Sequence, residues 1–244
     1  MSPTSFSLCF PAPRAYRLFM PLGKILSTVV LLCAVVLFSA TTSAAKNIPP
    51  FMPSHHYLVR VVLFAQDTRR GGTVFLGDSI TEGWLVFPEF AKHGLRNRGI
   101  GGDTTFGVLM RLNELVLEKP DKIFILLGVN DIIRDQFHGL VQRYEYIVNT
   151  LELALPDTKI YMQSLLPVNW EDFPRITEYV NNDKIRDVNK RLKRLADQSG
   201  LEFIDLAPHF EDDNGNLKKA LSLDGLHINQ KGYAVWYDLI KDKL

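Results

Sequence analysis

Two short segments near opposite ends of the chain carry the residue types of a nucleophile and its base. Ser79 follows an apolar run that ends at Gly77, and near the C-terminus Asp224 stands three residues before His227. A serine hydroxyl attacks a carbonyl carbon when a histidine takes its proton and a carboxylate orients that histidine. On a loop, this spacing would let the Asp224 carboxylate reach the imidazole ring. These three residues are therefore the candidate catalytic group.

Each of these segments also has a plain structural interpretation. Ser79 could cap the helix expected to begin there, because serine is a favoured N-cap residue. Asp224 and Gly225 form a common turn dipeptide, and His227 could cap the last helix. Neither segment alone decides between the two interpretations.

Two further segments could supply hydrogen-bond donors for the oxyanion that forms during acyl transfer. One is Asn97–Thr105, at the end of the second predicted strand, whose glycines, Gly102 among them, allow close backbone approach and an exposed N–H. The third run is followed by an amide side chain, Asn130. The plain alternatives are a turn with Asp103 as N-cap and an Asx turn at Asn130. All four segments come in order at the ends of successive strands or before the last helix, and this order favours catalysis.

The elements that must position these residues alternate along the chain. Apolar runs predict five strands, several of them without polar alternation, as strands covered on both faces have. The predicted strands are Thr73–Leu76, Leu95–Ile100, Lys122–Leu127, Lys159–Gln163 and Leu201–Ile204. Helical spacing of apolar residues predicts helices over Thr105–Leu117, Gly139–Leu155, Glu178–Gln198 and Lys231–Leu244. This alternation predicts a parallel sheet in a three-layer α/β/α domain.

The segments outside these elements predict a simple domain organisation. Residues 46–72 are expected to lead into the fold and to include one helix packed on it. No repeat or linker indicates a second domain after residue 73. Leu165–Ile176, with two prolines, predicts a loop that shapes a pocket, and Asp212–Gly215 predicts a polar turn.

The first 45 residues have the pattern of a secretory signal peptide. Lys24 precedes the apolar run Ile25–Phe38, and small residues follow up to Ala45, after which we expect cleavage. The alternative is a transmembrane anchor, but the run is shorter than the roughly 20 residues that span a bilayer. Met20 begins a complete signal by itself, so residues 1–19 could lie upstream of the true start. The pattern predicts a periplasmic or secreted protein without stable membrane insertion after cleavage.

Composition and charge exclude several function classes. The chain has 244 residues, 46% of them hydrophobic and 23% charged, as in ordinary folded proteins. Three of the 28 Lys and Arg residues, and none of the 27 Asp and Glu residues, lie in the first 45 positions. The other 199 residues therefore carry 25 basic and 27 acidic side chains, a net charge of −2. A domain with nearly equal numbers of basic and acidic residues gives no electrostatic indication of nucleic-acid binding. Both cysteines, Cys9 and Cys33, precede residue 46, so the mature chain would have no disulfide and no thiol nucleophile.

The four segments together resemble the SGNH hydrolases, also called GDSL esterases. Ser79, Gly102, Asn130 and His227 match the four letters of the name, and the resemblance covers about Thr73–Leu244. It implies a flavodoxin-like five-stranded parallel sheet and a hydrolase domain over residues 73–244.

The resemblance also implies a role for each residue. Ser79 would attack an ester carbonyl, while His227 would take the proton and return it to the leaving alcohol. Asp224 would fix the histidine tautomer and stabilise the imidazolium. The backbone N–H groups of Ser79 and Gly102 and the side-chain amide of Asn130 would bind the oxyanion.

Two similarities within that family bear on the substrate. Gly99–Thr105 is similar to the platelet-activating-factor acetylhydrolase branch, and Gln163–Asn169 is similar to secreted bacterial members described as sialate or carbohydrate O-acetylesterases. Export and the second similarity favour an O-acetyl group on a carbohydrate such as sialic acid. The alternatives are lysophospholipase, platelet-activating-factor acetylhydrolase-like or broad short-chain esterase activity. Five aromatic residues could line either kind of pocket: Trp84, Phe87, Phe106, Trp170 and Phe173.

Other readings fit the residues less well. A metal hydrolase is disfavoured, because the sequence has no His-Glu-x-x-His segment and no histidines at zinc spacing, and no cofactor is expected. A non-catalytic carbohydrate-binding module would keep the sheet, yet all three triad residues are present. Asp78 and Asp131, beside Ser79 and Asn130, are expected to hydrogen-bond loop backbone. The expected partner is a small-molecule or glycan ester.

Overall fold

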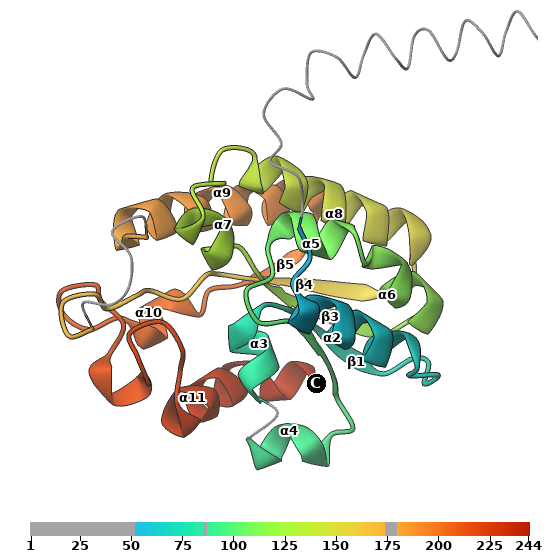
Figure 1. Ribbon diagram of the computed structural model, residues 1–244, viewed down its shortest axis with the longest axis horizontal. Helices are drawn as coiled ribbons and strands as arrows, with labels where there is room; N and C mark the ends of the chain where they lie inside the picture. The colour runs from blue at the N-terminus through green and yellow to red at the C-terminus, as the bar shows by residue number, and fades with distance from the viewer. Residues whose placement is uncertain (1–51, 85–86, 174–179) are drawn as a thin grey trace, which may run out of the picture. The chain divides into compact units, whose positions relative to one another are not determined.

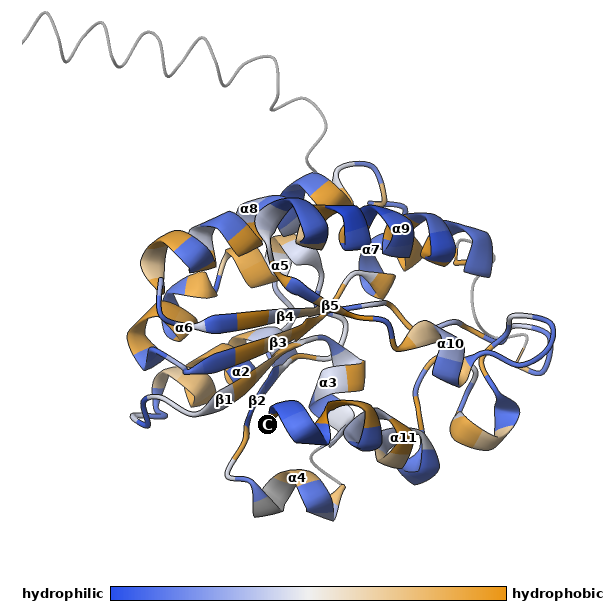
Figure 2. Ribbon diagram, turned by 180° about the vertical axis from the view of Figure 1, so that it is seen from behind, coloured by the Kyte–Doolittle hydropathy of each residue, from blue (hydrophilic) through white to orange (hydrophobic). Residues whose placement is uncertain are grey.

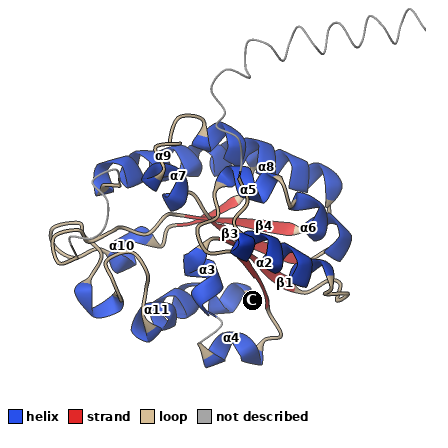
Figure 3. Cartoon of the chain, viewed as in Figure 1, coloured by secondary structure: helices blue, strands red, loops and turns tan. Residues whose placement is uncertain are grey.

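The computed structural model describes residues 52–84, 87–173 and 180–244, which belong to one compact unit, Phe51–Leu244. A five-stranded sheet lies at its centre (Figure 3). The strands are β1 (Thr73–Gly77), β2 (Arg96–Gly99), β3 (Lys122–Leu126), β4 (Lys159–Gln163) and β5 (Glu202–Ile204). Neighbouring strands are all parallel, in the order β2-β1-β3-β4-β5. This is the flavodoxin-like order, so the predicted sheet is confirmed.

Helices cover both faces of the sheet (Figure 1). One face packs against α5 (Thr105–Leu109), α6 (Leu112–Glu118), α8 (Leu140–Ala154) and α9 (Asn182–Ser199). The other face packs against α3 (Ser79–Gly83), α4 (Pro88–Lys92), α10 (Ala207–Phe210) and α11 (Gln230–Ile240). In β1, Val74 lies in the first core, whereas Phe75 lies in the second and stacks on Phe124 at 4.8 Å. The predicted three-layer α/β/α architecture is therefore confirmed.

The remaining elements lie around these layers. Helix α2 (His55–Ala65) packs Tyr57 and Phe64 against Ile100. Helix α7 (Val129–Ile133) follows β3, and the short 3₁₀ helices η3 (Lys219–Leu221) and η4 (Lys241–Lys243) lie near the C-terminus. The outer surface of α9 is largely hydrophilic (Figure 2). Among the described helices, none has the length and apolar character that crossing a bilayer requires.

Several predicted segments lie outside the described residues. They are the predicted signal peptide over residues 1–45, the start of the lead-in segment at 46–51, residues 174–176 of the predicted loop and the first two residues of the helix predicted from Glu178. The described part of that helix begins at Asn182, where the side chain of Asn181 accepts a hydrogen bond from the N–H of Lys184.

The prediction of one helix over Thr105–Leu117 is wrong. The structure has two helices, because Arg111 leaves helical geometry with φ −125° and ψ 13°. Its guanidinium turns inward and donates to the carbonyls of Gly77 and Arg98, at the ends of β1 and β2. The apolar spacing that predicted one helix continues across the break, since both helices pack on the same core.

Candidate active site

Ser79 lies at the first turn of α3, directly after β1 ends. The turn is tight: a Cβ on Gly77 would lie 2.4 Å from the carbonyl oxygen of Leu126, so only glycine fits there. Asp78, and not Ser79, caps the helix, because its Oδ1 accepts from the N–H of Ile80 at 3.0 Å. The interpretation of Ser79 as a helix cap is therefore wrong, and its hydroxyl is free for another partner.

That partner is His227, which the fold brings from the other end of the chain. The distance from His227 Nε2 to Ser79 Oγ is 2.9 Å, and from His227 Nδ1 to Asp224 Oδ2 is 2.7 Å. With its proton on Nδ1 and donated to Asp224, the ring leaves Nε2 to accept the serine proton. His227 does not cap α11, because Asn229 does so through the N–H groups of Lys231 and Gly232.

The loop before α11 fixes the Asp224 carboxylate. Its Oδ1 accepts from the backbone N–H groups of Leu226 and His227, at 3.0 and 2.8 Å, while Oδ2 faces the ring. Partial burial would raise the pKa of Asp224, but these hydrogen bonds outweigh it and hold the pKa below its ordinary value. The carboxylate thus stays ionised beside the imidazole, although its side chain is 55% exposed.

The glycine loop after β2 lies against the same site. Gly102 has φ +75°, a left-handed conformation that favours glycine, and its carbonyl accepts from Arg134 at 2.7 Å. Neither the N–H of Gly102 nor that of Ser79 donates to another described residue. Helix α5 is capped by Thr104 and not by Asp103, so that alternative is wrong.

Asn130 reaches the glycine loop from α7. Its Nδ2 donates to the carbonyl of Asp103 at 3.0 Å, and its side chain is nearly buried. An Asx turn would direct this side chain to its own backbone, so the structure does not support that alternative. One amide hydrogen is engaged by Asp103, which leaves the second for another acceptor.

Buried carboxylates lie beneath these groups. Asp78 accepts the N–H of Ile80, and Asp131 accepts both the N–H and the hydroxyl of Thr105, at 3.0 and 2.5 Å. Both carboxylates bind backbone N–H groups, but these belong to the first turns of α3 and α5 and not to loops as expected. Burial raises the pKa of Asp131, and it raises that of Asp78 to about 7, helped by the charges of Asp103 and Asp131.

Arg111 is a residue that the sequence analysis missed. Its guanidinium is buried and donates to the Asp103 carboxylate, to Glu114 and to the strand-end carbonyls of Gly77 and Arg98. It thereby ties the glycine loop to the ends of β1 and β2. An arginine between apolar helical residues was the one signal in the sequence that could have indicated this inward position.

The predicted pocket-lining aromatics are in part core residues. Trp84 is buried between Phe75 and Phe90, at ring-centroid distances of 5.0 and 4.0 Å. Phe87 packs on the same core, whereas Trp170 is 48% exposed on the loop after β4. Within the described residues, no group of His, Cys, Asp and Glu side chains is arranged to hold a metal ion.

The segment Gln163–Asn169 is also buried and makes internal contacts. Gln163 Oε1 accepts from Trp236 Nε1 at 2.7 Å, and Ser164 Oγ accepts from two backbone N–H groups at the start of α10. Asn169 Nδ2 donates to the carbonyl of Leu217. The residues that are similar to bacterial O-acetylesterases are therefore buried residues that connect β4 to neighbouring elements.

A parallel α/β sheet that carries a Ser–His–Asp chain at its carboxyl edge defines the general class of serine hydrolases. Comparison with known proteins gives the family: the model of the GDSL-like lipase/acylhydrolase family matches residues 75–235. The chain belongs to this family, that of the SGNH hydrolases, as the resemblance implied. It is a carboxylic ester hydrolase.

Individual relatives are consistent with that assignment. The platelet-activating factor acetylhydrolase IB subunit alpha1 of Rattus norvegicus is 29% identical over 194 residues, which cover 75% of this chain and 77% of the relative. The N-acylneuraminate cytidylyltransferase of Escherichia coli O18:K1:H7 is 30% identical over 168 residues, 66% of this chain but only 37% of that enzyme. A GDSL-like lipase from Bacteroides thetaiotaomicron superposes with a TM-score of 0.67 at 23% identity, over 77% of this chain and 96% of that one.

Proposed function

We propose that the chain hydrolyses acetyl and other short acyl esters, with O-acetyl groups on a carbohydrate such as sialic acid as the main substrate. The observation that carries the catalytic part is the hydrogen-bonded chain from Ser79 through His227 to Asp224, with distances of 2.9 and 2.7 Å. It supplies a nucleophile, a base and an orienting carboxylate in line.

The reaction proceeds in two halves. Ser79 Oγ bonds to the ester carbonyl carbon while His227 Nε2 takes its proton, and the tetrahedral oxyanion accepts from the N–H groups of Ser79 and Gly102 and from Asn130 Nδ2. The carbon–oxygen bond to the alcohol breaks, and the alcohol leaves with the proton from His227. Water then attacks the acyl-enzyme, His227 takes and returns a proton in the same way, and the carboxylic acid is released.

The preference for a short acyl group is supported by the relatives: the rat protein is by name an acetylhydrolase.

The carbohydrate part rests on the sequence similarity at Gln163–Asn169 and on the Escherichia coli relative, whose name specifies N-acylneuraminate. A phospholipid-type acetyl ester is the second candidate, favoured by the alignment with 77% of the acetylhydrolase subunit. Export by residues 1–45 is part of the proposal. Protein recovered outside the cytoplasm should have the mass of a chain that starts at Lys46, and a full-length mass there would contradict cleavage.

The test is hydrolysis of p-nitrophenyl esters from acetate to palmitate by the wild type and Ser79→Ala. Activity confined to C2–C4 and abolished in the variant is expected. Ser199→Ala is the matched control, since the end of α9 precedes β5 and so lies at the sheet edge opposite the triad. A preference for C8 or longer would contradict the proposed preference for short acyl groups, and a fully active Ser79→Ala would contradict the role of Ser79 as the nucleophile. O-acetylated sialic acid and an acetylated phospholipid then separate the two substrate classes.

A further inference from the structure

The glycine loop that presents Gly102 lies directly against helix α3. A Cβ on Gly99 would lie 2.3 Å from the backbone nitrogen of Glu82, so only glycine allows this close approach. The N–H of Gly101 donates to Glu82 Oε2 at 2.5 Å. Glu82 lies on the same short helix as Ser79, one turn further on. One side chain therefore connects the helix that begins at the proposed nucleophile to the loop that carries a proposed oxyanion donor.

The hydrogen bonds of this loop leave one N–H group free for a substrate. From Gly99 to Asp103, each backbone N–H except that of Gly102 donates to a described residue. The N–H of Asp103 closes a turn on the carbonyl of Ile100 at 3.0 Å. Gly102 is the third residue of that turn, and its φ of +75° is typical of the third residue of a type II turn. The loop is thus held around a single unused donor, whose position depends on the contacts that hold the turn.

Side chains of α2 hold the Glu82 carboxylate in place. Arg60 Nε lies 3.3 Å from Glu82 Oε1, and His56 Nε2 lies 3.0 Å from Glu82 Oε2. Arg60 also donates through Nη2 to the carbonyl of Gly99 at 3.0 Å. The guanidinium therefore binds both the carboxylate and the loop. Its positive charge offsets that of Glu82, which would otherwise oppose the formation of an oxyanion at the neighbouring donor.

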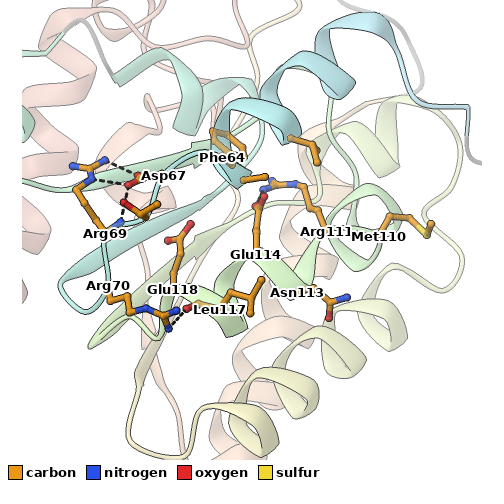
Figure 4. A pocket seen from close by; sticks show the side chains of 13 residues that line it. Phe64, Asp67, Arg69, Arg70, Met110, Arg111, Asn113, Glu114, Leu117 and Glu118 are labelled. Carbon is orange, nitrogen blue, oxygen red and sulfur yellow. Dashed lines mark hydrogen bonds and ion pairs between the residues drawn. The ribbon is translucent and has the colours of Figure 1, made fainter.

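The other end of α2 borders a cavity. This cavity of about 430 Å³ lies between the C-terminal half of α2 and α6, with Phe64 and Glu114 among its lining residues (Figure 4). Phe64 lies under the guanidinium groups of Arg98 and Arg111, which are 4.8 and 5.7 Å from the centroid of its ring. The cavity reduces the apolar contact between α2 and the domain. The polar contacts at the N-terminal half therefore have a larger share in holding α2 beside the glycine loop.

We propose that Glu82 is a positioning residue of the oxyanion hole. By accepting from Gly101, it sets the distance between the N–H groups of Ser79 and Gly102, two of the three proposed donors. Both groups must lie at hydrogen-bond distance from the same oxygen, and a displacement of about 1 Å can cost about 10²-fold in rate. Because Glu82 acts through the loop, its effect should appear in the transition state and not in the binding of substrate. This inference rests on the proposed function, in which Gly102 is an oxyanion donor.

The test is hydrolysis of p-nitrophenyl acetate by the wild type, Glu82→Ala and Glu82→Gln. Glu82→Ala should lower kcat about 10- to 100-fold and change KM by less than about twofold, because a misplaced donor matters only once the oxyanion forms. The amide oxygen of glutamine can still accept from Gly101, so Glu82→Gln should lower kcat by less than about threefold. Glu145→Ala, at an exposed position on α8, is the matched control and should behave as the wild type does.

Inhibition by trifluoroacetone separates a misplaced donor from a partly unfolded protein. Ser79 Oγ adds to the carbonyl carbon of this ketone, His227 takes the serine proton, and the carbonyl oxygen becomes an oxyanion in the hole. In Glu82→Ala the inhibition constant should rise by about the factor by which kcat/KM falls. A loss of folded protein would lower kcat but leave the inhibition constant of the remaining folded molecules unchanged.

The outcomes separate this inference from the proposed function. The inference alone is overturned if Glu82→Ala keeps the wild-type kcat, if its kcat falls while the inhibition constant stays the same, or if Glu82→Gln loses as much activity as Glu82→Ala. Failure of the proposed function would appear in other proteins of the series. The wild type would then hydrolyse no ester, or Ser79→Ala would remain active, and either result would overturn both.

Discussion

Burial of the Asp78 carboxyl should make the free energy of unfolding depend on pH. Its carboxyl is fully buried next to Ser79, and its Oδ2 has no hydrogen-bond partner among the described residues. Burial raises its pKa from 3.8 to about 7, with the N–H of Ile80 opposing the shift and nearby carboxylates adding to it. Asn could accept the same N–H of Ile80 but cannot ionise, so Asp78→Asn isolates the effect of the charge.

The sign of the effect follows from the two pKa values. Below about pH 4 the carboxyl is protonated in both the folded and the unfolded chain. Between pH 4 and 7 the unfolded chain releases the proton while the folded chain keeps it, so the free energy of unfolding falls as pH rises. The interval from pH 5 to the folded pKa of about 7 spans two pH units, over which the free energy of unfolding falls by about 3 kcal/mol. Above pH 7 the loss is complete.

The assay is urea unfolding of the wild type and Asp78→Asn at pH 5 and pH 8. From pH 5 to pH 8, the free energy of unfolding of the variant should rise by about 3 kcal/mol relative to that of the wild type. The contributions of the other buried acids are nearly the same in both proteins and largely cancel in this difference. Asp213→Asn, in an exposed turn, is the matched control and should show no such gain. An equal difference between variant and wild type at pH 5 and pH 8 would refute the assignment of a raised pKa to Asp78.

Further predictions concern the proposed catalytic groups. Asn130→Ala should lower kcat for p-nitrophenyl acetate by about 10²–10³, as for the loss of one oxyanion donor, and near-full activity would contradict its role. Asp224→Asn should keep the fold, since the side chain is 55% exposed, but lower kcat by about 10⁴ because the histidine loses its orienting carboxylate.

The sheet and the position of the triad could be predicted from the sequence for one physical reason. Strands buried on both faces need uninterrupted apolar runs, such as Ile123–Leu127, so β1, β3 and β4 were visible to within a residue or two. Parallel strands bring their carboxyl ends to one edge, and so residues after successive strands had to meet there. The contact between Ser79 and His227, 148 residues apart, follows from this topology.

The buried polar contacts could not be predicted in the same way. All four residues of β2, including Arg96 and Arg98, are buried, which no local pattern indicates. Their burial depends on Asp67 and Glu118, which lie 20 or more residues from Arg98 in sequence and face it only in the folded chain. The break at Arg111 has the same origin, since the strand-end carbonyls that it binds come from distant elements.

These polar contacts also bear on how the proposed oxyanion hole keeps its shape. Arg111 ties the Asp103 carboxylate to the ends of β1 and β2, and Asn130 holds the Asp103 carbonyl from α7. The loops that present Ser79, Gly102 and Asn130 are thus joined to one another by directional bonds and not by apolar packing alone. Such bonds fix donor positions more tightly than dispersion contacts do, and a hole that is already formed needs no reorganisation when the oxyanion appears. Burial raises the pKa of the acids held there, and the ionised Asp78 lowers the stability of the fold above about pH 7, which is a cost of the preorganised site.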